Sequence, residues 1–267
     1  MPLKRTPEIN RGYYSRVYAI AHSVETFCRR EGATAQIVNI GSGFDTLFWR
    51  LKSNTFSTYV DVDSTDVVEH KIRAIKQHPE LLEPCGTLNG QSNTSNFHSD
   101  RYHAIAQDAT KGRQLIDKLV NKCAINRNQP ILFIFECVLL YWSEEARTNL
   151  FYALNKQFTN CNIVIFDIVN TMDKFSSLMQ QSLYESNTPL LGANSTRTLE
   201  DWNQQLQRSG ARHVQSWLMT EVYQKLIDQN EKSKIERIEF LDEIELLFQL
   251  FNHYCLILAS NNSPTDW

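Results

Sequence analysis

Short apolar runs alternate with helix-compatible segments along the first two thirds of the chain. The runs have the length and β-branched content of buried strands, whereas the segments between them repeat apolar residues with a helical period. Five strands are predicted in this region, at 36–40, 57–63, 102–107, 131–142 and 163–169. Because strands and helices alternate, the pattern predicts an α/β fold with a parallel sheet, right-handed crossovers and helices on both faces.

Helices are predicted between and after these strands, at 9–30, 45–51, 64/65–77, 110–123 (with Thr110 as the cap) and from Ser143 onward. Residues 84–99 are rich in Gly, Asn and Ser and indicate a surface loop. After residue 170 the alternation changes: helices are predicted at 175–184, 199–208 and 235–251, and strands at 214–218 and 253–259. We expect one domain over residues 1–267 with an insertion at about 170–210.

A glycine turn follows the first strand, where Ile40 is succeeded by Gly41, Ser42 and Gly43. A buried strand, a glycine turn and a helix place backbone N–H groups at the strand's carboxyl end, where nucleotides bind in doubly wound folds. The turn lacks the third glycine of the dinucleotide motif, since Phe44, Asp45 and Thr46 follow Gly43. The sequence therefore favours a cofactor without phosphates, S-adenosylmethionine, over NAD.

Three other predicted strands have an acidic residue within them, at their end or directly after it. Asp63 lies 22 positions after Gly41, close to the spacing of about 20 expected for a ribose-binding carboxylate. Asp108 follows the third strand, and Glu136 lies inside the most hydrophobic run, where an unpaired carboxylate would cost several kcal/mol. These groups are expected to converge at one edge of the sheet. Each also has a structural interpretation, because Asp63 and Asp108 could cap the helices that follow them and Gly41 could form only a turn.

The composition is that of an ordinary globular domain, with 267 residues, 42% hydrophobic and 21% charged. The net charge of −3 and the scattered basic residues argue against a nucleic-acid surface, and the longest apolar run is too short to span a bilayer. Six cysteines without CxxC spacing favour reduced, buried thiols over disulfides or zinc. We therefore expect a soluble, cytoplasmic monomer without a metal site that binds neither nucleic acid nor membranes.

Several segments of the sequence resemble the leucine carboxyl methyltransferase family. The similar segments are PEINRGYYSRV (7–17), QIVNIGSGFDTLFWRL (36–51), YVDVD (59–63), RYHAIAQD (101–108), ECVLLY (136–141) and RIEFLDEIELLFQLFNHYCLILA (237–259). The resemblance implies a class I methyltransferase fold, a seven-stranded sheet whose last strand is antiparallel. It also implies S-adenosylmethionine as the methyl donor and the C-terminal leucine carboxylate of the protein phosphatase 2A catalytic subunit as the acceptor.

The family pattern also implies roles for individual residues. The residues that would contact the cofactor are Arg16, Gly41, Gly43, Asp63, Asp108, Ala109 and Glu136. Arg16 is the candidate for a second, catalytic duty, docking the acceptor carboxylate, and Tyr141 is the candidate for lining the acceptor site. The insertion at about 170–210 would recognise the protein substrate. Without the resemblance, Arg16 would be taken for an exposed charge on an amphipathic helix, and Tyr141 for the edge of the core.

The sequence departs from the family pattern in two places. Relatives usually carry several dozen residues before the segment at 7–13, including a lysine that contacts the cofactor, so a more open site is expected here. Phe166 and Ile168 stand where relatives tend to have tyrosine and glutamine, which would alter acceptor contacts. Three alternatives stay open: a tRNA wybutosine carboxyl methyltransferase, a non-catalytic phosphatase-binding homologue and an NAD-dependent oxidoreductase.

Overall fold

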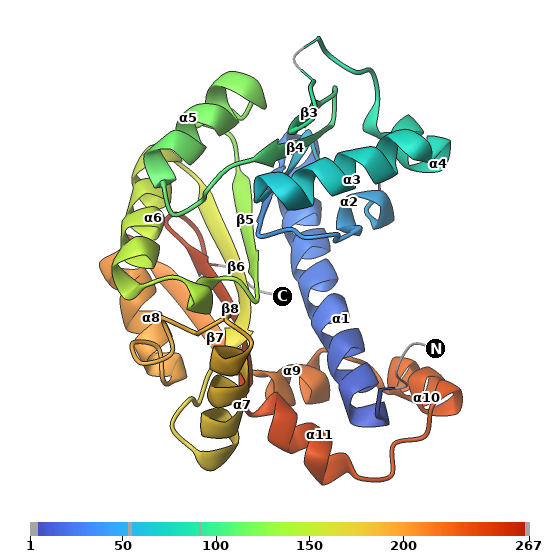
Figure 1. Cartoon of the computed structure of the whole chain (residues 1–267), viewed down its shortest axis with the longest axis vertical. Helices are drawn as coiled ribbons and strands as arrows, with labels where there is room; N and C mark the ends of the chain where they lie inside the picture. The colour runs from blue at the N-terminus through green and yellow to red at the C-terminus, as the bar shows by residue number, and fades with distance from the viewer. Residues whose placement is uncertain (1–4, 53–54, 91, 265–267) are drawn as a thin grey trace.

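A computed structural model describes residues 5–52, 55–90 and 92–264 and places eight strands in one sheet (Figure 1). The strands, in chain order, are β1 (Gln36–Ile40), β2 (Thr58–Asp63), β3 (Asn96–His98), β4 (Tyr102–Ala106), β5 (Ile131–Glu136), β6 (Cys161–Ile168), β7 (His213–Leu218) and β8 (Tyr254–Ser260). Their order across the sheet is β3-β4-β2-β1-β5-β6-β8-β7.

Eleven α-helices accompany these strands in the described part of the chain. They are α1 (Pro7–Glu31), α2 (Leu47–Arg50), α3 (Thr65–Gln77), α4 (Pro79–Leu82), α5 (Gly112–Lys122), α6 (Glu144–Gln157), α7 (Lys174–Glu185), α8 (Leu199–Arg208), α9 (Met219–Lys225), α10 (Gln229–Ile238) and α11 (Ile244–Phe251). Short 3-10 turns occur at Gly32–Thr34, Glu83–Cys85 and Leu139–Tyr141. No described helix is long and apolar enough to cross a membrane.

The centre of the sheet is parallel, as the alternating pattern predicts. Strands β4, β2, β1, β5 and β6 run in one direction, and Val38 lies opposite Val60 on one side and Phe133 on the other. The chain proceeds from β1 to β2 and β4 on one side and to β5 and β6 on the other. The strand order therefore reverses between β1 and β5, which is where ligands bind in open α/β sheets.

The last strand is antiparallel, as predicted, because β8 pairs antiparallel with both β6 and β7. The prediction of seven strands is wrong by one. Asn96–His98 forms β3, antiparallel to β4, within the segment expected to be a loop. Three residues are too few to show an alternating pattern among Asn and Ser neighbours, yet Phe97 is fully buried there.

The two faces of the sheet are covered by different helices (Figure 1). Side chains on one face, such as Ile37, pack with α1, α3, α9 and α11, whereas side chains on the other, such as Val38, pack with α5, α6 and α8. This alternation follows from the two-residue repeat of a strand. The helix predicted from Ser143 is capped as expected, since Ala146 N–H donates to Ser143 Oγ.

Two predicted elements are interrupted in the structure. The run 131–142 is not one strand: β5 ends at Glu136, and Cys137 adopts a φ of 53° before the chain turns at Leu139–Tyr141. The predicted helix 235–251 is split into α10 and α11, and Phe240 between them is 69% exposed. Its apolar residues therefore do not form one buried stripe, and the helix α9 that precedes α10 was not predicted.

The predicted insertion, 170–210, contains α7 and α8. Helix α8 belongs to the layer on the sheet, where Trp202 is fully buried and the Arg147 guanidinium lies 5.0 Å from its ring. Helix α7 lies at the end of the molecule near α11 (Figure 1), and His253 Nε2 lies 2.8 Å from Asp173 Oδ2 at its start. Leu178 and Tyr184 on α7 are 70% and 73% exposed.

Candidate functional site

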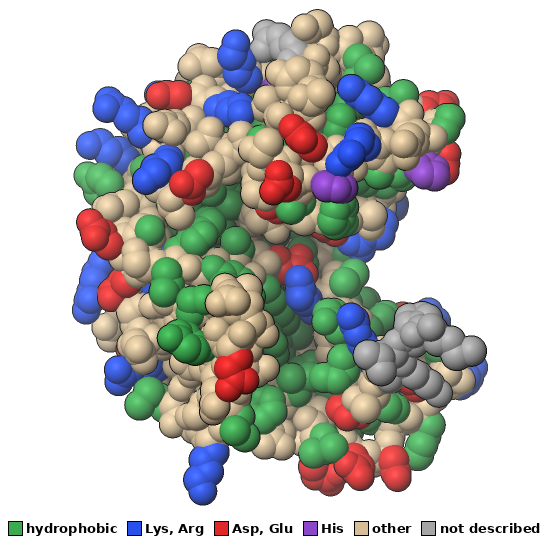
Figure 2. Space-filling view, viewed as in Figure 1, with side chains coloured by type: hydrophobic (Ala, Val, Ile, Leu, Met, Phe, Trp, Pro, Cys, Tyr) green, Lys and Arg blue, Asp and Glu red, His purple; other side chains and the backbone are tan. Residues whose placement is uncertain are grey.

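A cavity of about 530 Å³ opens at the carboxyl ends of β1, β2 and β4. The residues that line it are Ile40, Gly41, Val62, Asp63, Ser64, Thr65, Ala106, Gln107, Asp108, Ala109, Val138 and Trp142. The space-filling view shows that this face of the molecule is hollowed; the basic side chain visible within the hollow is not part of the lining of this cavity (Figure 2). The fold thus brings most of the predicted cofactor residues to one place.

The glycine turn after β1 forms one wall of this cavity. Gly41 has a φ of 72°, and a Cβ at this position would lie 2.6 Å from Val138 Cγ2. Both the backbone conformation and the close approach of Val138 therefore require glycine. Gly43 has a φ of 50°, but a Cβ there would meet nothing within 4 Å.

Asp63 fixes the position of the glycine turn. Its Oδ2 accepts a 2.7 Å hydrogen bond from Gly43 N–H, and its Oδ1 accepts one of 2.7 Å from Ser64 N–H. These bonds are not the helix cap considered from the sequence, because α3 begins at Thr65 after Ser64 and has no side-chain cap. A carboxylate oxygen can accept more than one hydrogen bond, so Asp63 also retains acceptor capacity toward hydroxyl groups in the cavity.

Asp108 and Ala109 form the opposite wall, after β4. Asp108 Oδ1 accepts hydrogen bonds from the N–H and the hydroxyl of Thr110, at 3.0 and 2.6 Å. The prediction that Thr110 caps α5 is wrong, because α5 begins at Gly112 after Lys111 and has no side-chain cap. Thr110 instead holds the Asp108 carboxylate in the loop. Ala109 is 5% exposed and contributes a small, apolar surface.

The lining of this cavity carries negative but no positive charge. Asp63 and Asp108 are its charged residues, and no Lys, Arg or His is among the described residues that line it. Phosphate groups in proteins are normally met by basic side chains or by several backbone N–H groups, so this lining suits a nucleoside without phosphates. Trp142 and Val138 supply apolar surface for an aromatic base.

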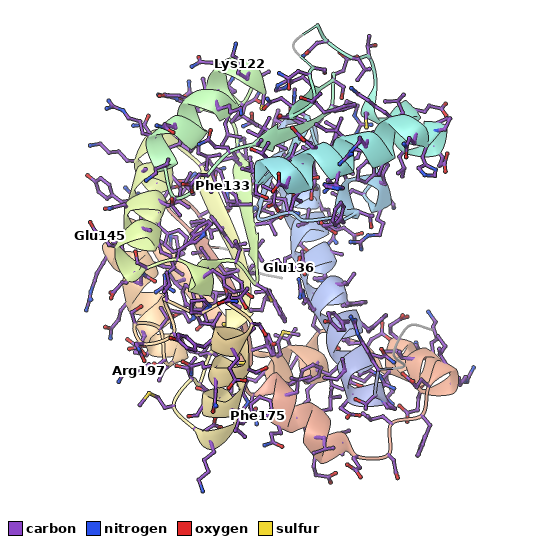
Figure 3. All side chains as sticks on the ribbon, in the orientation of Figure 1. Lys122, Phe133, Glu136, Glu145, Phe175 and Arg197 are labelled. Atoms are coloured by element: carbon purple, nitrogen blue, oxygen red, sulfur yellow. The ribbon has the colours of Figure 1, made fainter. Side chains whose placement is uncertain are left out.

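Glu136 has a partner on α1. Arg16 Nε donates a hydrogen bond to Glu136 Oε1, and the two side chains are 29% and 15% exposed. Figure 3 shows Glu136 at the end of β5, in the space between this strand and α1. Burial raises the pKa of Glu136, and the Arg16 guanidinium opposes that rise. The ion pair with Arg16 therefore explains how the structure accommodates a carboxylate at the end of an apolar run.

Arg16 also borders a second, smaller cavity of about 120 Å³. The other residues of its lining are mostly apolar or aromatic: Ile9, Gly12, Tyr13, Phe166, Leu250, Phe251 and Tyr254. The Arg16 guanidinium carbon lies 5.6 Å from the Phe166 ring, which stacks on Tyr254 at 5.3 Å. Sequence reasoning noted Phe166 but missed Tyr13 and Tyr254, although Tyr13 lies only three positions before Arg16 on the same helix.

Tyr141 lines neither cavity in the described structure. It lies in the 3-10 turn after β5 and is 41% exposed. The same turn rests on Asp167, which the sequence analysis did not single out for function. This fully buried carboxylate accepts hydrogen bonds from Leu139 N–H at 3.0 Å and Ile168 N–H at 2.8 Å. Burial raises the pKa of Asp167 to about 6, although these N–H groups oppose the rise.

Two solved structures with a similar fold are named as methyltransferases. A Thermobifida fusca protein assigned as a methyltransferase matches 94% of this chain and 81% of its own, with a TM-score of 0.64 and 12% identity. A phosphoethanolamine N-methyltransferase of Haemonchus contortus, solved with S-adenosylhomocysteine, matches 91% of this chain and 55% of its own, with a TM-score of 0.52 and 11% identity. These similarities assign the class I S-adenosylmethionine-dependent methyltransferase fold.

Similar sequences narrow the assignment to a family. The leucine carboxyl methyltransferase model matches residues 2–155. Leucine carboxyl methyltransferase 1 of Caenorhabditis elegans is 35% identical over 96% of this chain and 79% of its own length. The tRNA wybutosine-synthesizing protein 4 of Rattus norvegicus is 30% identical over 97% of this chain but only 39% of its own length. The chain therefore belongs to the leucine carboxyl methyltransferase family.

Proposed function

We propose that this protein transfers a methyl group from S-adenosylmethionine to the C-terminal leucine carboxylate of the protein phosphatase 2A catalytic subunit. The observation that carries the proposal is the position of Arg16. Its guanidinium pairs with Glu136 at the carboxyl end of the central strand β5 and borders an apolar cavity of about 120 Å³. A cation beside an apolar cavity suits an acceptor that ends in an aliphatic side chain and a carboxylate. We also propose that the protein is a monomer and that it acts in the cytoplasm.

The larger cavity is the proposed cofactor site. Gly41 has no room for a side chain because Val138 packs against it, and this packing sets the shape of the proposed site. In this proposal Asp63 accepts hydrogen bonds from the ribose hydroxyls, and Asp108 with Ala109 holds the adenine. Glu136 and Arg16 carry opposite charges that match the ammonium and carboxylate groups of the methionine portion.

When bound, S-adenosylmethionine supplies an electrophilic methyl group on a sulfonium. An oxygen of the leucine carboxylate forms the new bond to the methyl carbon while the sulfur–methyl bond breaks, and its electron pair returns to sulfur. No proton is transferred, so the reaction requires no general base. The protein's contribution is to align the carboxylate and to remove water from it, and alignment alone can supply several kcal/mol.

Arg16 and the apolar cavity provide these two contributions. Arg16 directs the carboxylate by charge, while Tyr13, Phe166 and Tyr254 enclose the leucine side chain and exclude water. Phe166 presents an aromatic ring without a hydroxyl, so it adds only apolar surface to this pocket. The exposed apolar side chains of α7, including Leu178 and Tyr184, support recognition of a macromolecule by the 170–210 segment.

Two acceptors tested in parallel separate the proposal from its nearest rival. The protein is incubated with labelled S-adenosylmethionine and either the phosphatase catalytic subunit or total tRNA. We expect label on the phosphatase only, released as methanol by mild base because a methyl ester is base-labile. Label on tRNA but not on the phosphatase would contradict the proposal and favour a wybutosine-type activity.

A further inference from the structure

Three buried side chains with nitrogen and sulfur donors meet at the edge of the sheet, away from both cavities. They are His98 on β3, His103 on β4 and Cys123 directly after α5, with exposed fractions of 2%, 4% and 0%. One donor atom from each lies within 4.8 Å of those of the other two. Figure 3 labels Lys122, which marks this end of α5.

The pairing of β3 with β4 creates the arrangement. His98 and His103 are directly opposite each other in the antiparallel ladder, and their Nδ1 atoms lie 2.9 Å apart. The residue after α5, Cys123, places its Sγ within 4.8 Å of a ring nitrogen of each histidine. The spacing of these residues in the sequence matches no common metal motif, so the composition alone favoured plain buried thiols.

The donor set is one that zinc uses, and the three donor atoms lie within 4.8 Å of one another. Zinc in proteins is held by histidine nitrogens at 2.0–2.1 Å and cysteine sulfur at about 2.3 Å in a tetrahedral arrangement. Two such nitrogens on one tetrahedral ion lie roughly 3.3 Å apart, so the two rings need to separate by only about 0.4 Å. No carboxylate belongs to the cluster as described, which disfavours calcium and magnesium.

The 2.9 Å between the two Nδ1 atoms is a hydrogen-bond distance, so one imidazole N–H joins the rings in the described structure. Binding of a metal ion would require that ring to carry its proton on Nε2 instead, because imidazole binds metals through an unprotonated nitrogen. Cysteine would bind as the thiolate and release its proton on metal binding.

We propose that His98, His103 and Cys123 form a binding site for a zinc ion that ties the β3–β4 hairpin to the end of α5. Three protein donors leave one position of a tetrahedral ion for a water molecule or another small ligand. The site lies outside the proposed cofactor and acceptor cavities, so its role is to stabilise the edge of the sheet. This inference does not depend on the proposed methyl transfer.

Cobalt substitution tests the proposal directly. The tag-free, full-length protein is stripped with a chelator, dialysed and titrated with Co²⁺ as a spectroscopic probe for zinc. We expect one ion per chain, with an intense near-ultraviolet thiolate-to-cobalt band that disappears when Zn²⁺ is added. We also expect the midpoint of thermal unfolding to rise with the bound metal, because a ligand that binds only the folded state stabilises it.

Two variants assign the sulfur ligand. Cys123→Ala should lose the charge-transfer band, whereas Cys161→Ala, which removes another fully buried thiol on β6, should retain it. A wild-type protein that gives no such band, or a band that persists in Cys123→Ala, would overturn the proposal. If Cys123→Ala does not fold, the wild-type titration still tests for the band. The His103→Gln variant is then expected to lose the band as Cys123→Ala would.

Discussion

Gly43 N–H donates a 2.7 Å hydrogen bond to Asp63 Oδ2, and this bond joins the turn after β1 to the end of β2. The same carboxylate accepts from Ser64 N–H. Asp63 therefore shapes the wall of the cavity in which we propose it binds the ribose. A structural role and a binding role are combined in one side chain, which determines how its variants must be designed.

Replacing Asp63 with asparagine removes the negative charge of this side chain and keeps its shape. Asp63→Asn should weaken S-adenosylmethionine binding by roughly 10- to 150-fold, because it removes charge-assisted hydrogen bonds worth about 1.5–3 kcal/mol. Isothermal titration calorimetry measures the affinity. Asp66→Asn, an equal charge change at an exposed position of α3, is the control and should bind normally. Normal affinity in Asp63→Asn would remove this residue from the site.

The two glycines of the turn should differ in their tolerance of alanine. Gly41→Ala should lose cofactor binding by at least roughly tenfold, because its Cβ would overlap Val138 and its positive φ costs on the order of 1 kcal/mol or more. Gly43→Ala has the same backbone penalty but open space, so its loss should be smaller. Equal losses in the two variants would show that the contact with Val138 does not matter for binding.

Arg16 is predicted to serve both substrates. Arg16→Ala should raise the dissociation constant of S-adenosylmethionine and also the KM for the acceptor, because its guanidinium pairs with Glu136 and borders the apolar cavity. Arg29→Ala, an exposed arginine on the same helix, controls for loss of positive charge. If only cofactor affinity changed, docking of the acceptor carboxylate would have to be assigned to another residue.

Asp167 should make stability depend on pH in a defined direction. Its pKa in the folded protein is about 6, above the ordinary value of 3.8, so the folded state binds the proton more tightly than the unfolded state. Its contribution to the free energy of unfolding should therefore fall as pH rises from 4 to 6, by up to about 3 kcal/mol, and stay constant above that.

The comparison with Asp167→Asn isolates this contribution. Urea unfolding of both proteins at several pH values should show that wild type loses stability relative to the variant between pH 4 and 6. Asp117→Asn, at an exposed position of α5, should follow wild type across the range. A difference between wild type and Asp167→Asn that does not change with pH would contradict the assignment.

Local patterns predicted most of the sheet, including the edge strand β7, but missed the other edge strand, β3, and the end of β5. The apolar runs identified β1 and β2 closely, because buried strands leave a strong signal. The end of β5 at Glu136 was missed because the turn after it is as apolar as the strand. That turn is held by Asp167 from the neighbouring strand, a contact that no local pattern contains.

The part of the candidate site that lies at the ends of strands could be predicted from the sequence. Gly41, Asp63 and Asp108 lie where a parallel sheet places them, at the border of one cavity. The partnership of Arg16 with Glu136 spans 120 positions and depends on how α1 crosses the sheet. Tyr254 lines the proposed acceptor cavity because β8 is antiparallel to β6, which brings Tyr254 opposite Ile168.

The most direct test of the central claim is methyl transfer to the natural form of the proposed acceptor. Labelled S-adenosylmethionine and the protein are incubated with the intact phosphatase 2A catalytic subunit and, separately, with the same subunit lacking its last leucine. We predict base-labile label on the intact subunit and none on the shortened one. Equal labelling of the two subunits, or no labelling of the intact subunit under conditions in which S-adenosylmethionine binds, would contradict the proposed function.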